Sequence, residues 1–305
     1  MEITDTLDIA ARREKKVYPF FLDGEYVNVN NLDDLNLANY ILRSQHFDKR
    51  KLSLVIPAYN EAESIGYVID DFKNKVDEII VADNNSVDDT AKLAKERGAT
   101  VYTRAFKGYG DALRFGMEKA SGDILVLTEA DGSFRSRDLN KMLEYIKDAD
   151  MVIGTRTTKQ MVEQAANMSF LLRWGNVIAA KFLELLWLRT DQPRLTDLGC
   201  TYRAIWKKAY SKIKNSLKAN GPEFSPEMMI EVMNFDMRMI EIPITYGGRL
   251  GGASKFSRGL FGSIKTGMRM LKLIIYKKLR RVLWYSYRRV RKLKLMIHKR
   301  LSKNY

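Results

Sequence analysis

With 305 residues, 46% of them hydrophobic, the chain is long enough for one large α/β domain with appendages. The single cysteine, Cys200, excludes an internal disulfide framework and fits a reducing compartment. The net charge of +15 is uneven, because the segment from Lys255 to Tyr305 holds 17 Lys and Arg residues and no acidic residue. We therefore expect this tail to have an anionic partner, either lipid or nucleic acid.

The sequence predicts neither a secretory signal nor a membrane-spanning helix. The first residues are polar and acidic, so no secretory signal sequence is expected. The longest apolar run, Val177 to Leu188, is interrupted by Lys181 and Glu184, so it predicts no membrane-spanning helix. The segment from Val17 to Val29 has aromatic residues around a central Asp-Gly and suggests a small hairpin within an N-terminal extension, residues 1–50.

From Leu52 onward, short apolar strands alternate with amphipathic helices. The predicted strands are Leu52 to Pro57, Glu78 to Asp83, Thr100 to Arg104, Ile124 onward, and Asp150 to Gly154. Helices between them are expected to end near Lys75, Gly98, Ala120 and Ile146. Repeated units of this length predict an α/β fold with a mostly parallel sheet and helices on both faces. Right-handed crossovers then place the carboxyl ends of the strands at one edge.

The most informative stretch is Ile124 to Ser133, where an apolar run ends in Glu129 and Asp131. Acids directly after a buried strand stand at the carboxyl edge, where open α/β sheets bind ligands. Two such carboxylates can share a Mg²⁺ or Mn²⁺ ion that phosphate oxygens also hold. Taken alone the pattern is more typical of a solvated turn at a strand end, so its weight depends on its neighbours.

Polar residues follow the other predicted strands and are expected at the same edge. Asp83 is placed to accept hydrogen bonds from a base or ribose. Lys107 lies in a loop, KGYG, whose small residues allow the backbone to approach phosphate or sugar. Tyr59, Glu61 and Arg156 complete the set. Neither a GxGxxG fingerprint nor a phosphate loop of the GxxxxGK[ST] type is present, so we predict a nucleotide and metal site without dinucleotide or NTPase motifs.

The region from Leu52 to about Lys255 resembles the family 2 glycosyltransferases of the GT-A fold, and within them the dolichyl or polyprenyl-phosphate hexose synthases. Seven segments occur in the family's order, which makes the resemblance specific. They are Ile56 to Glu61, Val81 to Thr90, Lys107 to Gly116, Glu129 with Asp131, Ile153 to Arg156, Thr196 to Ile205, and Ile242 to Lys255.

The resemblance implies a role for each matching residue. Pro57, Tyr59, Glu61 and Asp83 would hold the base and ribose of a nucleotide-diphosphate sugar. Asp131, with Glu129 beside it, would bind Mg²⁺ or Mn²⁺ at the diphosphate and stabilise the charge of the departing group. The donor diphosphate and an acceptor phosphate would be gathered by Arg156, Arg203, Arg249, Ser254 and Lys255, with Lys107 also in the donor site. Asp197 is the candidate base if the acceptor is a hydroxyl.

The chain departs from the family pattern at two places. Glu129 stands where most relatives have Asp, and Gly199 to Tyr202 replaces the usual Ser-Gly-Phe order. The first departure affects metal ligation and the second affects acceptor choice. Cys200, inside the second segment, is interpreted as a packed, inert thiol.

Two further segments have both a structural and a functional interpretation. The predicted helix from Asn167 to Leu188 is apolar on several faces, which indicates either core packing or a surface that faces lipid or the acceptor. The segment from Ala219 to Met228 is a loop before a helix, where Glu223 and Glu227 have either structural roles or contacts with donor or acceptor.

After Lys255, apolar residues recur at steps of three and four with cations between them. This pattern predicts an amphipathic helix over residues 256–305 that lies on an anionic membrane surface. The alternatives are a helix packed on the catalytic domain, which is residues 51–255, and a nucleic-acid tail, which we favour least.

The function expected from the resemblance is hexose transfer from a UDP- or GDP-sugar to a polyprenyl or dolichyl phosphate, with inversion. The enzyme would need a divalent metal and would sit peripherally on the cytosolic face of a membrane. One alternative keeps the fold and changes the acceptor to a glycan hydroxyl or a small phosphorylated molecule. Another is a catalytically weakened domain that serves as a membrane-bound scaffold or nucleic-acid binder.

Overall fold

The computed structural model describes residues 12, 26–164, 166, 170–187, 194–251 and 259–301. Contacts divide the chain into two compact units, Met1–Asn39 and Tyr40–Tyr305, and the sheet lies in the second. The strands are β1 (Leu52–Ala58), β2 (Glu78–Asp83), β3 (Thr100–Thr103), β4 (Ile124–Leu127), β5 (Met151–Thr155), β6 (Arg203–Trp206) and β7 (Met239–Pro243). The helices are α2 (Leu32–Ser44), α3 (Ile65–Phe72), α4 (Thr90–Glu96), α5 (Tyr109–Lys119), α6 (Leu139–Tyr145), α7 (Phe170–Leu186), α8 (Lys207–Ile213), α9 (Phe224–Asn234) and α10 (Gly259–Leu301).

The seven strands form one sheet in the order β3-β2-β1-β4-β6-β5-β7. Every neighbouring pair is parallel except the two made by β6, which runs antiparallel to β4 and β5. The parallel architecture predicted from the alternating pattern is therefore confirmed, whereas β6 and β7 were not predicted. Because β6 is reversed, its first residue, Arg203, pairs with Leu127 and Ile153 near the carboxyl ends of β4 and β5.

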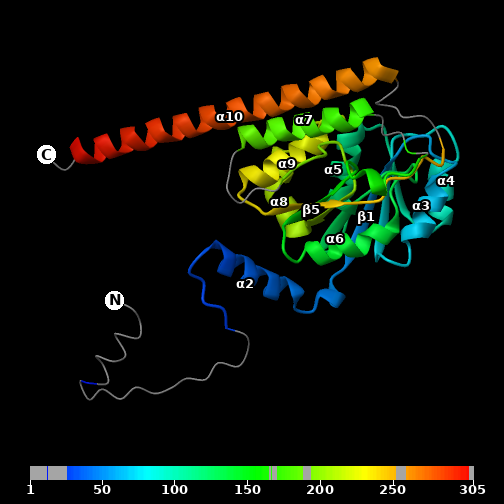
Figure 1. Ribbon diagram of the computed structural model, residues 1–305, viewed down its shortest axis with the longest axis horizontal. Coiled ribbons are helices and arrows are strands. Elements are labelled where there is room, and N and C mark those ends of the chain that lie inside the picture. Colours follow the sequence, from blue (N-terminus) through cyan, green and yellow to red (C-terminus); the bar gives the residue numbers. More distant parts are fainter. Residues whose placement is uncertain are drawn as a thin grey trace. The chain divides into compact units, whose positions relative to one another are not determined.

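Helices cover both faces of the sheet (Figure 1). One face packs against α3, α4 and α6 through buried side chains such as Ile65, Ala94 and Leu139. The other packs against α5, α7, α8 and α9, with Leu113 and Leu183 among the buried residues. Both faces of β4 are buried, which explains its uninterrupted apolar run.

Helix α7 has one side in the core and one side exposed, so core packing accounts for only part of its apolar sequence. Ala180 and Leu183 are buried in the core, while Trp174, Ile178 and Leu185 are exposed. The predicted helix from Asn167 to Leu188 is thus found over Phe170–Leu186. The predicted hairpin, in contrast, lies mostly outside the described residues, and Tyr26 to Val29 form no strand.

Helix α10 confirms the predicted helical tail from Gly259 to Leu301. Its first half contacts α7 and α9, so part of this helix packs on the domain that carries the sheet. No helix in the described part of the chain is both long enough and apolar enough to span a bilayer. The boundaries we drew after residues 50 and 255 remain predictions.

Candidate active site

The acid pair lies in a tight turn at the end of β4. The backbone N–H and the hydroxyl of Ser133 both donate to Asp131 Oδ1, at 2.9 and 2.6 Å. Between them Gly132 has a φ of 75°, a left-handed conformation that favours glycine, and a Cβ there would lie 2.6 Å from Leu250 Cδ1. One Asp131 oxygen is thus used to build the turn, and the other is left for a ligand.

A loop after β7 closes over this turn and brings in Arg249. The Leu250 N–H donates to the Asp131 carbonyl at 2.9 Å, and the Gly247 N–H donates to the Ser133 carbonyl at 2.8 Å. Arg249 Nη2 then lies 3.0 Å from Asp131 Oδ2 and 3.7 Å from Glu129 Oε2. The guanidinium therefore lies against both carboxylates and offsets one of their two negative charges.

The carboxylates fit a hard divalent cation. Asp131 Oδ2 is buried and accepts no hydrogen bond from the described residues, so the Arg249 charge is its one close partner there. The described residues include no cluster of three or more acidic, histidine or cysteine side chains that could enclose a metal. A cation here would take its other ligands from phosphate oxygens and water, as Mg²⁺ usually does.

Glu129 is held by a pair of hydroxyl groups that sequence reasoning did not single out. Thr201 Oγ1 donates to Glu129 Oε1 at 2.7 Å, and the hydroxyl of Tyr109 contacts Thr201 Oγ1. Burial, followed by the negative charge of Asp131, raises the pKa of Glu129 to about 7, against the opposing effects of Arg249 and Thr201. Glu129 is therefore a carboxyl group that titrates near neutrality when no cation is bound.

This raised pKa predicts how stability depends on pH in the cation-free protein. A carboxyl whose folded-state pKa is raised contributes stability that is fully present below its ordinary pKa of 4.5 and is lost as pH rises through about 7. Glu129→Gln should therefore make the thermal midpoint fall less between pH 5 and pH 8 than in the unmodified protein. Identical pH dependence in the two proteins, measured by calorimetry with chelator present, would contradict the assignment.

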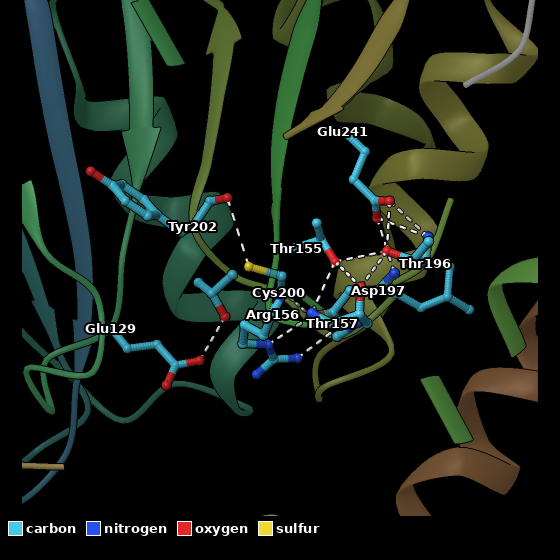
Figure 2. Close-up of polar contacts among 12 residues, drawn as sticks. Glu129, Thr155, Arg156, Thr157, Thr196, Asp197, Cys200, Tyr202 and Glu241 are labelled. Atoms are coloured by element: carbon cyan, nitrogen blue, oxygen red, sulfur yellow. Dashed lines mark hydrogen bonds and ion pairs between the residues drawn. The ribbon is translucent and has the colours of Figure 1, made fainter. Parts of the chain in front are cut away.

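Arg156 and Asp197 form a buried ion pair on the same side of the sheet as Glu129 (Figure 2). Arg156 donates from Nε and Nη2 to the two Asp197 oxygens at 2.7 and 2.9 Å, and its backbone N–H adds a third bond at 3.1 Å. Burial opposes ionisation of Asp197, but the Arg156 charge and hydrogen bonds outweigh it and lower the pKa of Asp197. An acid in this state is a weak base, which disfavours proton abstraction by Asp197.

A network of threonine hydroxyl groups and Glu241 holds the segment that carries Asp197. Thr196 bonds to Thr155, Thr157 and Glu241, and the Asp197 N–H also donates to Glu241 at 3.0 Å (Figure 2). Burial raises the pKa of Glu241 to about 7, despite these hydrogen bonds. The network fixes the segment that carries Asp197.

Arg203 has a different environment from that of a ligand-binding arginine. It is buried and donates to the carbonyls of Cys200 and Ser225 at 2.8 and 2.6 Å. These bonds tie the segment before β6 to the first turn of α9. Cys200 itself is buried, and burial raises the pKa of its thiol to about 12, in line with a packed, inert cysteine.

The residues predicted to hold base and ribose lie at or just after the carboxyl ends of β1 and β2. Asp83 is buried and accepts hydrogen bonds from the hydroxyl and backbone N–H of Ser86. Glu61 follows β1 and accepts from Ser64, whereas Tyr59 is 42% exposed. Pro57 is the sixth residue of β1.

The structure brings most of the predicted residues to the carboxyl edge. Lys107 is exposed in the loop before α5, and its backbone N–H donates to Asp111 at 3.0 Å. Ser254 and Lys255 lie outside the described residues. Thr201 and Tyr109 are the additions, and their place inside two of the family-like segments was the available signal. The roles of all these residues remain predictions.

The topology and the acid pair at its carboxyl edge define a GT-A-type transferase domain. Residues 53–214 match the model of glycosyl transferase family 2. The chain belongs to glycosyl transferase family 2 and is a glycosyltransferase, and the resemblance to polyprenyl-phosphate hexose synthases is confirmed.

Two relatives of known activity are similar over about two thirds of this chain. An undecaprenyl-phosphate mannosyltransferase of Micrococcus luteus is 31% identical over 223 residues, which are 68% of this chain and 88% of that protein. The low-salt glycan biosynthesis hexosyltransferase Agl6 of Haloferax volcanii is 31% identical over 212 residues, which are 67% of this chain and 49% of that protein.

A solved structure has the same fold at lower identity. Glucosyl-3-phosphoglycerate synthase from Mycobacterium tuberculosis, in complex with Mn²⁺, UDP and glucosyl-3-phosphoglycerate, superposes with a TM-score of 0.58 at 20% identity. The similarity covers 83% of this chain and 86% of that one. At this identity the comparison establishes the GT-A fold.

Proposed function

We propose that the protein transfers a hexose from a nucleotide-diphosphate sugar to a polyprenyl phosphate, with a divalent metal and with inversion. The observation that carries the proposal is the acid pair, because Asp131 keeps one buried oxygen without a hydrogen bond at the edge where α/β sheets bind ligands. Support for the acceptor comes from the 31% identical undecaprenyl-phosphate mannosyltransferase. Support for the donor and metal comes from the Mn²⁺ and UDP bound to the structural neighbour.

Different residues bind the nucleotide, the metal ion and the phosphates. Asp83, Glu61, Tyr59 and Pro57 hold the base and ribose, and the acid pair holds the cation. That cation, when bound, offsets negative charge that develops on the diphosphate. Arg249 is paired with both carboxylates in this structure. Once a metal ion takes its place beside the acid pair, the Arg249 guanidinium is free to contact phosphate oxygens.

In the transfer step, an oxygen of the acceptor phosphate attacks the anomeric carbon of the sugar. The bond from that carbon to the diphosphate oxygen breaks, and the nucleoside diphosphate leaves with the electron pair. A phosphate acceptor is already ionised, so no side chain has to remove a proton. The lowered pKa of Asp197 in its pair with Arg156 supports this acceptor over a hydroxyl. Arg156 then serves to attract phosphate, and the basic helix α10 holds the enzyme on the cytosolic face of a membrane.

The test is transfer of radiolabelled sugar from a panel of UDP- and GDP-sugars to polyprenyl phosphate, with Mn²⁺ or Mg²⁺. We expect label in the organic phase and its loss on addition of chelator. Donor cleavage without labelled lipid would move the acceptor to a hydroxyl or a small phosphorylated molecule. Absence of donor turnover with either metal would favour a scaffold.

A further inference from the structure

Helix α7 exposes a stripe of large apolar side chains. Trp174, Ile178 and Leu185 are 49%, 67% and 63% exposed, and steps of four and seven place them on one side of the helix. The opposite side, with Ala180 and Leu183, is buried in the core. Three large apolar residues in line on a charged protein mark a surface for interaction.

Helix α10 exposes a second stripe of the same kind. Its members are separated by steps of four, seven, four and three and are roughly half exposed: Ile264, Met268, Ile275, Leu279 and Val282. Lys265 and Lys272 are exposed beside this stripe. The first half of α10 therefore has an apolar side with cations at its border.

Buried ion pairs fix α10 to the domain. Lys277 is 5% exposed and lies 2.7 Å from both Glu227 and Glu231 of α9. On its other side, Lys278 donates to the Leu186 carbonyl of α7 and lies 5.3 Å from the centre of the Trp187 ring. Helix α10 therefore runs along α7, as Figure 1 shows, and cannot rotate without exposing buried charges.

The two stripes border the seam between the helices. On α10, Lys277 contacts α9 and Lys278 contacts α7. Going around the helix beyond Lys278, the next side chains are those of Ile275 and Leu279. On α7 Leu186, whose carbonyl accepts from Lys278, is followed around the helix by the partly buried Phe182 and then by Leu185 and Ile178. The exposed stripes therefore flank the same seam, and we call the two together the seam surface.

We propose that the seam surface of α7 and α10 contacts an anionic lipid bilayer. Apolar side chains bordered by lysine match the interface of such a bilayer, which attracts cations and accepts apolar groups. Nucleic acid would use the cations and leave the apolar residues unpaired. This contact also sets where the acceptor lipid enters. In that respect the proposal deepens the proposed function and rests on it.

Helix α7, which carries half of the seam surface, also borders the candidate acceptor site. A Cβ built on Gly199 would lie 3.0 Å from Arg156 Nη2 and 3.3 Å from Asn176 Oδ1, so α7 borders the Arg156–Asp197 pair. Asn176 is two residues from both Trp174 and Ile178, so it lies on the opposite side of the helix from the exposed stripe. A bilayer against that stripe would lie one helix diameter, roughly 10 Å, from the Arg156 guanidinium.

The first test is co-sedimentation with vesicles of phosphatidylglycerol and phosphatidylcholine. The combined variant Ile178→Gln, Leu185→Gln should bind about tenfold more weakly or worse, because membrane affinity scales with buried apolar area. The matched control is Tyr145→Gln on α6, a 47% exposed side chain remote from the seam, and it should bind as the unmodified chain does. Equal binding of the double variant and the control would overturn the proposal, as would salt-sensitive RNA binding without vesicle binding.

The second test localises the contact. In a Trp284→Phe background, vesicles of dibrominated lipid should quench Trp174 fluorescence, and the quenching should disappear in Trp174→Phe, Trp284→Phe, which keeps the less exposed Trp187 and Trp206. No difference in quenching between the two proteins would overturn a bilayer contact at α7. Transfer to a short, water-soluble prenyl phosphate without vesicles is measured in parallel, and its failure would count against the proposed function instead.

Discussion

Asp131→Asn is expected to lower kcat/KM for sugar transfer by at least about 100-fold, the usual cost of removing one group that stabilises transition-state charge. Asp131 is 2% exposed, its Oδ2 is free of hydrogen bonds from the described residues, and Arg249 lies 3.0 Å away. An amide keeps the shape and loses the charge that would bind the cation. Steady-state rates across a Mn²⁺ titration measure the effect, and the same titration followed calorimetrically should give weaker Mn²⁺ binding.

Asp123→Asn is the matched control for this substitution. Asp123 stands before β4, at the opposite end of the strand that Asp131 follows, and accepts a hydrogen bond from the Lys51 N–H at 3.1 Å. Rate and Mn²⁺ affinity should both remain within about twofold, since a surface substitution of this kind usually changes stability by no more than about 0.5 kcal/mol. Near-normal turnover by Asp131→Asn would remove the acid pair from the mechanism.

Lys277→Met is expected to destabilise the protein by about 3 to 5 kcal/mol, because it leaves two buried carboxylates without their cation. Lys277 lies 2.7 Å from Glu227 and from Glu231, and it also donates to the Ser216 carbonyl at 2.9 Å. Glu227 in turn accepts the backbone N–H groups of Lys218 and Ala219, so it has no room to turn away. Chemical and thermal unfolding, read by circular dichroism, measure the loss.

Two further variants separate buried charge from lost packing. Lys272→Met removes an exposed cation from the same helix and should leave the unfolding midpoint almost unchanged. Adding Glu231→Gln to Lys277→Met removes one of the two stranded charges and should recover part of the stability. Full stability of Lys277→Met alone would mean that α10 is not anchored by these ion pairs.

The predicted parallel strands were found within one or two residues of their expected ends, because each is a short apolar run bounded by turn residues. Strand β6 escaped prediction for a physical reason. It has four residues, and what makes Arg203–Trp206 a strand is the space between β4 and β5, which it fills antiparallel to both. Short segments of this kind take their conformation from tertiary pairing.

In the candidate site, too, some features follow from the sequence and others from tertiary contacts. Strand pattern alone placed Glu129 and Asp131 at the carboxyl edge, whereas the Thr201 hydroxyl that holds Glu129 comes from 72 residues further along the chain. Arg156 and Asp197 were predicted as separate contributors to binding and chemistry, and the fold joins them in one ion pair.

By itself, the sequence determined the α/β architecture, the edge that carries the acid pair, the family and the uneven charge of the tail. The architecture, the edge and the charge of the tail depend on periodicity and composition, which act between residues close in the chain. The family rests on the resemblance of seven short segments in order. Only the tertiary structure decided that Arg249 faces Asp131, that Asp197 is neutralised by Arg156, and that Lys277 of the basic helix is buried. Such pairings join residues far apart in sequence, and burial determines their strength by removing the water that would otherwise solvate each charge.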